Sequence, residues 1–72
     1  MVVTKLVPSA EALKRLHQLA WSVPEDVVVR SLDGTVTADA KSSMGLFALD
    51  FSFPVEIVTD APAILAELEQ WP

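Results

Sequence analysis

The chain has 72 residues, enough for one small domain, and 51% of them are hydrophobic, which argues against disorder and for a packed core. Ten acidic residues against five basic ones give a net charge of −5. This balance argues against nucleic-acid binding, because phosphates need a basic surface, and it favours a basic protein partner.

Cysteine is absent, so disulfides, thiol chemistry and thiolate metal sites are excluded. A basic-then-apolar leader is also absent, and no apolar run approaches the length of a membrane span. We therefore expect a cytoplasmic protein without membrane contact.

The N-terminal part of the chain predicts a strand followed by a helix. The β-branched run Val2–Val7 is typical of a strand, which Pro8 ends. Ser9 is a favourable helix N-cap, and apolar residues at helical spacing continue to about Ser22. Pro24 then prevents the helix from continuing.

A hairpin and a short helix are predicted next. Val27–Leu32 and Thr35–Asp39 form the two strands, joined at Asp33-Gly34 by a tight type I′ turn, which needs positive φ at both residues. Ser42 then caps a short helix in the stretch Lys41–Leu49, by accepting from a backbone N–H of that helix.

The C-terminal part predicts a strand and a final helix. Val55–Thr59 is the strand, with Val55 and Ile57 on one face. Asp60 is the expected cap of the helix, which tolerates Pro62 in its first turn. The apolar stripe of this helix consists of Ile64, Leu65, Leu68 and Trp71. Trp71 and Trp21 are expected to close the ends of a small core.

These elements predict an α+β domain of βαββαβα order over residues 1–72. Its four-stranded sheet should be largely antiparallel, with the long helices on one face. Thr4, Arg30, Thr37 and Glu56 are candidates for the other face, which would be open to solvent or to a second subunit.

The stretch that begins at Lys41 carries a family resemblance. Lys41, Ser42, Met44 and Gly45 are followed by Leu49 and then by a Glu-Ile strand. This pattern resembles the HPr family, the histidine phosphocarriers of the bacterial sugar phosphotransferase system. The resemblance implies an open-faced β-sandwich, the fold of that family, for this chain.

The active loop of that family differs from this chain. The family has Gly-x-His-Ala-Arg-Pro at the start of the first helix, where this chain has Pro8–Lys14. Counting back from Ser42 places the missing histidine at Glu11, or at Ala10 if an extra hairpin residue is counted. A carboxylate would repel an incoming phosphoryl group, so we expect no phosphate transfer from phosphoenolpyruvate through enzyme I.

His17 is the only histidine, and two interpretations of it remain open. It is either a residue at the boundary of the core or a relocated phosphate acceptor. A metal role is disfavoured, because a lone histidine without a second soft ligand binds metal poorly. Neither a catalytic set nor a glycine-rich phosphate loop is visible, so we expect no enzyme, cofactor or metal.

The resemblance also implies an interaction surface. Met44 and Phe47, with Ser43 beside them, correspond to the patch by which HPr-like proteins dock partners, although both could instead pack on their own sheet. Ser42 corresponds to a serine that a dedicated kinase phosphorylates in some bacteria, but it could also be only a helix cap. Ser43 could take either role.

The sequence therefore predicts an HPr-like interaction or regulatory module that is not a phosphocarrier. Two alternatives stay open. One is a phosphotransfer protein that uses His17 or Glu11 as acceptor, and the other is a homodimerising domain of unrelated role.

Overall fold

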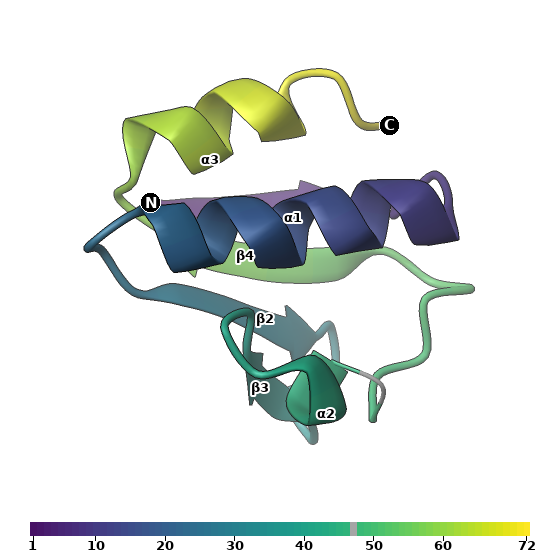
Figure 1. Ribbon diagram of the computed structural model, residues 1–72. Helices are drawn as coiled ribbons and strands as arrows, with labels where there is room; N and C mark the ends of the chain where they lie inside the picture. The colour runs from purple at the N-terminus through teal and green to yellow at the C-terminus, as the bar shows by residue number, and fades with distance from the viewer. Residues whose placement is uncertain (47) are drawn as a thin grey trace.

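The predicted order of elements is confirmed by a computed structural model, which describes residues 1–46 and 48–72, with Ser43 described by its backbone (Figure 1). The elements are β1 (Val2–Lys5), α1 (Ala10–Ser22), β2 (Val27–Ser31), β3 (Thr37–Asp39), α2 (Ser43–Leu46), β4 (Val55–Thr59) and α3 (Pro62–Leu68). Three strands are shorter than predicted: β1 ends at Lys5, β2 ends at Ser31 and β3 begins at Thr37.

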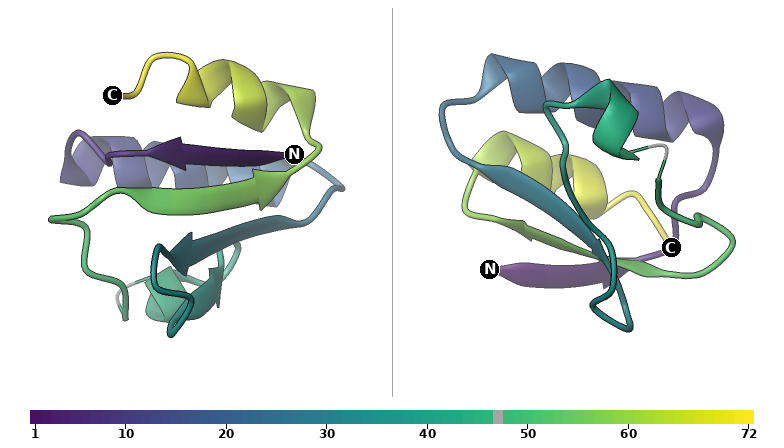
Figure 2. Two further views of the ribbon diagram at one scale, coloured as in Figure 1. Left: turned by 180° about the vertical axis from the view of Figure 1, so that it is seen from behind. Right: turned by 90° about the horizontal axis from the view of Figure 1, so that it is seen from below.

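The four strands form one antiparallel sheet in the order β1-β4-β2-β3. Figures 1 and 2 show α1 and α3 on the same side of this sheet, and none of the described elements covers the opposite face. The predicted fold class, an α+β open-faced sandwich with helices on one face of a four-stranded antiparallel sheet, is therefore confirmed.

The core lies between the helices and the covered face of the sheet. In the middle of that face, Ile57 pairs with both Val3 and Val29. Residues paired across neighbouring strands point to the same face of a sheet, so these three side chains form one row on the covered face. Leu16 of α1 and Ile64 of α3 pack on this row and are almost fully buried. Periodic apolar residues in both helices thus meet the alternating residues of the sheet, which fixes the two-layer fold.

The tryptophan prediction is right at one end of the core and wrong at the other. Trp71 is buried, with 5% of its surface exposed, whereas Trp21 is 67% exposed. The buried stripe of α1 runs through Leu16 and Ala20. One residue further along a helix points about 100° away, so Trp21 faces solvent.

The uncovered face carries the polar row that the sequence predicted. Thr4 pairs with Glu56, Glu56 with Arg30, and Arg30 with Thr37. Arg30 Nε donates to Glu56 Oε1 at 3.0 Å across the two central strands. Cross-strand pairs of opposite charge stabilise such a half-exposed face.

The predicted type I′ turn at Asp33-Gly34 is wrong. Gly34 has φ 76°, but Asp33 has a negative φ, and β2 and β3 are joined by a wider loop at positions 32–36. Asp33 Oδ1 accepts from Thr35 N at 3.0 Å and from Ser31 Oγ at 2.7 Å. Thr35 N thus donates to a side chain and not to the backbone, and the backbone turn closes one residue earlier, from Gly34 N to Ser31 O at 3.0 Å.

The predicted helix cap at Asp60 is also wrong. The N-cap of α3 is Ala61, and Pro62 opens the helix as predicted. Asp60 Oδ1 instead accepts from the ammonium of Met1 at 2.9 Å. Thr59 Oγ1 accepts from Ala61 N at 3.1 Å just before the helix, and no side chain of the described residues caps α3.

Among the described residues, α1 is the longest helix with 13 residues, and no helix there is both long and apolar enough to cross a bilayer.

Candidate protein-interaction site

The start of α1 is where the family resemblance would place a phosphorylated histidine. Ser9 caps the helix as predicted: its backbone is extended, and its Oγ accepts from Ala12 N at 3.1 Å. Ala10 and Glu11 follow in the first turn and are exposed. The helix start therefore presents a methyl group and a carboxylate, and the carboxylate is favoured there by the helix dipole.

His17 lies far from this helix start. It is two turns further along α1, about 12 Å from Ser9 along the axis. Its Nδ1 lies 2.8 Å from the carbonyl oxygen of Ala40. A carbonyl oxygen can only accept, so Nδ1 carries the proton and donates it. His17 thus links α1 to the segment that leads from β3 into α2.

The predicted cap of α2 by Ser42 is confirmed. Ser42 Oγ accepts from Gly45 N at 3.4 Å, a long hydrogen bond, and Ser42 N donates to Asp39 O at 2.9 Å. A Cβ added to Gly45 would lie 3.4 Å from the Cβ of Ala38 in β3. An alanine at this position would thus touch β3 without a clash, and α2 lies close to the sheet at this point.

Met44 projects from α2 into solvent. Its side chain is 85% exposed, whereas Leu46 in the same helix is 2% exposed. Leu46 fills the core position of α2, so the alternative in which Met44 packs on its own sheet is wrong. Phe47 and the side chain of Ser43, the other members of the predicted patch, lie outside the described residues.

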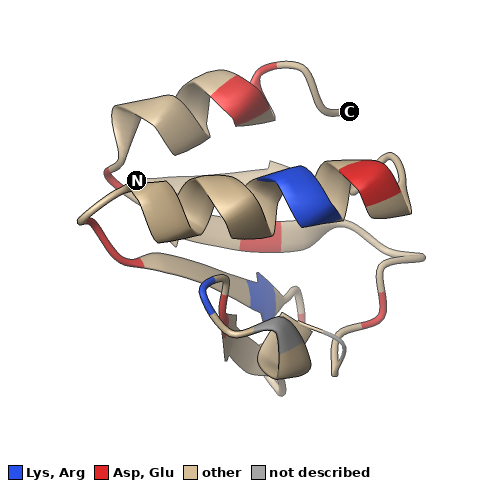
Figure 3. Cartoon of the chain, viewed as in Figure 1, with Lys and Arg blue, Asp and Glu red and all other residues tan. Residues whose placement is uncertain are grey.

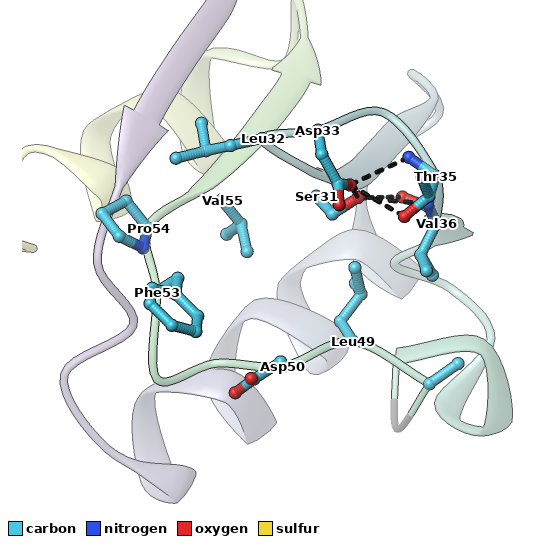
Figure 4. A pocket seen from close by; sticks show the side chains of 11 residues that line it. Ser31, Leu32, Asp33, Thr35, Val36, Leu49, Asp50, Phe53, Pro54 and Val55 are labelled. Carbon is cyan, nitrogen blue, oxygen red and sulfur yellow. Dashed lines mark hydrogen bonds between the residues drawn. The ribbon is translucent and has the colours of Figure 1, made fainter.

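A second surface feature was not predicted from the sequence. A groove of about 400 Å³ lies between the β2–β3 loop and the segment that leads from α2 into β4 (Figure 4). We call it the loop groove. Its apolar lining consists of Leu32, Val36, Leu49, Phe53, Pro54 and Val55, together with Ala48.

The loop groove has a carboxylate on each side. Asp33 lies on the β2–β3 loop and Asp50 on the segment opposite (Figure 4). Hydrogen bonds from Ser31 and Thr35 lower the pKa of Asp33 to about 2. Those from the side chain and backbone of Ser52 lower the pKa of Asp50. Both groups are thus held in the ionised form.

Sequence reasoning missed this groove because it read both segments only as connections. Two signals were present: Leu32 next to the turn residues, and the aromatic pair Phe51 and Phe53 in a loop. Large apolar residues in a connecting loop either reach the core or remain on the surface. Phe51 packs against the core and Phe53 does not.

One further ionic contact was also missed. Glu67 of α3 is nearly buried, and its Oε1 accepts from Arg15 Nη2 of α1 at 3.1 Å. The pair joins the two helices on the covered side of the sheet. Within residues 1–46 and 48–72, no three His, Asp or Glu side chains gather as a metal site would require.

Neither a family model nor any curated protein matches this chain.

Proposed function

We propose that this protein is an interaction module of HPr-like type that does not carry phosphate. The observation that supports it is Met44, which is 85% exposed on a helix whose Leu46 is buried in the core. Burying a methionine contributes roughly 1.5–3 kcal/mol, so a partner that covers Met44 gains binding energy. Met44 stands in the motif by which this chain resembles a family that docks proteins there.

The residues at the start of α1 support the second half of the proposal. Ser9 Oγ already accepts from Ala12 N, and Glu11 places a negative charge in the first turn. A phosphoryl group would meet a like charge there. His17 donates from Nδ1 to Ala40 O, so only its Nε2 has a lone pair that could accept a phosphoryl group.

Ser42 is the residue we propose for regulation of this module. Its side chain is exposed, and its hydrogen bond to Gly45 N is long, so a kinase would disrupt little. A phosphate there would add about −1.5 to −2 charge two residues from Met44. Partner binding at Met44 would then change with phosphorylation.

A phosphotransfer assay tests the non-carrier part. The protein is incubated with labelled phosphoenolpyruvate and enzyme I, beside an ordinary HPr as positive control. We expect no acid-labile label on this protein. Label that disappears in His17→Ala or in Glu11→Gln would contradict the proposal and identify the acceptor.

Site-specific photo-crosslinking tests the docking part. A benzoylphenylalanine replaces Met44 in one variant and Gln18, exposed on α1, in the matched control. We expect a cross-linked adduct in cells from the Met44 position alone. The same adducts from both positions, or none from Met44, would refute docking through α2.

A homodimer is the second candidate, and the uncovered sheet face favours it. Val2 is 51% exposed and pairs with Val58, which in turn pairs with Val28, so an apolar row crosses this face. A second copy could cover that row. Sedimentation equilibrium decides: a monomer at about 0.1 mM, where even weak dimers form, excludes the candidate.

A further inference from the structure

The loop groove displays large apolar side chains that the fold itself does not bury. Leu32 is 53% exposed and Phe53 is 65% exposed, one from each of the segments that border the groove. Leu49 and Val55 are buried beneath them and contribute to the core. The groove is therefore an apolar depression whose floor is fixed by the core and whose walls remain uncovered.

The two carboxylates of the groove are held in place before any partner arrives. All hydrogen bonds that described residues make to Asp33 go to Oδ1, from Ser31 Oγ, Thr35 N and Thr35 Oγ1. Asp50 likewise accepts from Ser52 N and Ser52 Oγ at Oδ1. In both groups Oδ2 can still accept from an external cation. Ordered side chains lose less entropy when a partner binds.

No positive charge of the groove itself offsets these carboxylates. Neither positions 31–36 nor positions 48–55 contain a lysine or arginine, and Figure 3 shows acidic colour alone among the charged residues of the segment that leads into β4. The whole chain carries a net charge of −5, which adds to the attraction for a cationic partner.

We propose that the loop groove binds a segment of a partner protein in which a large apolar side chain is flanked by lysine or arginine. The apolar side chain enters between Leu32 and Phe53, and the flanking cations contact Asp33 and Asp50. A second copy of this chain fits less well, because groove-to-groove pairing would bring four carboxylates together. The proposal rests on the proposed function in one respect, that the chain binds proteins, but it uses a different surface from Met44.

Peptide titrations followed by NMR test this proposal on the full ¹⁵N-labelled chain. The probes are four octapeptides: Leu-Phe flanked by Lys and Arg, the same pair flanked by Ser, the same pair flanked by Glu, and a basic peptide with Ser in place of Leu-Phe. We expect the first to bind with a dissociation constant of about 100 µM. Amide shifts should be confined to positions 31–36 and 48–55.

The other probes and the variants separate apolar from charged contributions. We expect each of the three other peptides to bind about tenfold more weakly than the first. Phe53→Ser should weaken the first peptide about tenfold, and the double variant Asp33→Asn with Asp50→Asn about fivefold. Asparagine keeps the Oδ1 acceptor, so the loops should stay ordered. Met44→Ser is the matched control and should leave this affinity unchanged.

Four results would overturn the proposal. They are no binding of the basic apolar peptide at about 1 mM, equal binding of the acidic peptide, indifference to Phe53→Ser, and concentration-dependent shifts of groove amides without peptide. The last would assign the groove to a second copy of this chain. A negative peptide result would contradict only the groove proposal, because the phosphotransfer and Met44 cross-linking assays test the proposed function separately. A negative cross-linking result at Met44 would likewise not affect the groove proposal.

Discussion

The contact between Arg15 and Glu67 predicts that removing one partner of this ion pair destabilises the fold more than removing the other. Arg15 Nη2 lies 3.1 Å from Glu67 Oε1, but the side chain of Arg15 is 63% exposed and that of Glu67 is 9% exposed. Arg15 therefore keeps most of its hydration in the folded protein. The carboxylate of Glu67 has lost nearly all of its water and depends on the guanidinium for compensation.

We expect Arg15→Met to lower the free energy of unfolding by about 1–2 kcal/mol, because it leaves a nearly buried carboxylate without its partner. Glu67→Met should change it by less than about 0.5 kcal/mol, because the loss of the ion pair is offset by apolar contact between α1 and α3. The double variant should resemble Glu67→Met.

Thermal unfolding followed by circular dichroism measures these differences. One kcal/mol shifts the melting temperature of a domain of this size by about 4–8 °C, so the shift for Arg15→Met is well resolved. Lys14→Met, on an exposed position of the same helix, is the matched control and should have little effect. Strong destabilisation by Glu67→Met with no effect of Arg15→Met would refute the reasoning.

Three further predictions concern the loops and the link between α1 and α2. The Asp33 carboxyl should titrate near pH 2 in a ¹³C NMR experiment. Since its folded pKa is depressed, its contribution to stability is present above the unfolded pKa near 4 and is lost as pH falls through about 2. A titration midpoint near 4 would contradict the hydrogen bonds that hold this loop. Gly34→Ala should lower the free energy of unfolding by about 1–2 kcal/mol because Gly34 has a positive φ, whereas Gly45→Ala should lower it by less than about 0.5 kcal/mol. Urea unfolding measures both values, and equal effects of the two substitutions would contradict the backbone geometry. His17→Phe should lower the free energy of unfolding by about 1–2 kcal/mol, since it removes the donor that hydrogen-bonds the carbonyl oxygen of Ala40. An unchanged midpoint of urea unfolding would exclude that hydrogen bond.

Much of the fold could be predicted because its determinants are local. The cap at Ser9 needs only a hydroxyl before an apolar stripe, and the strand Val55–Thr59 needs only alternation after a proline. The structure has the predicted cap at the start of α1 and the predicted bounds of β4. The same locality explains the cap at Ser42, where donor and acceptor are three residues apart.

The failed predictions concern side chains with distant or competing partners. Asp60 is an acceptable helix cap in isolation, but the ammonium of Met1 lies beside it at 2.9 Å through the pairing of β1 with β4. Asp33 has nearby hydroxyl donors that compete with a tight turn. Predicting the loop groove would have required the knowledge that the β2–β3 loop and the segment before β4 lie side by side in the fold.

The display of Met44 depends on contacts outside α2. A helix of four residues has no stability of its own, so its position must come from tertiary contacts. Gly45 lies close to Ala38 of β3, and Leu46 enters the core. The segment before α2 is held by His17 through the carbonyl of Ala40. The only histidine of the chain therefore stabilises the segment on which the proposed docking residue lies, and this structural role accounts for its position without any phosphate chemistry.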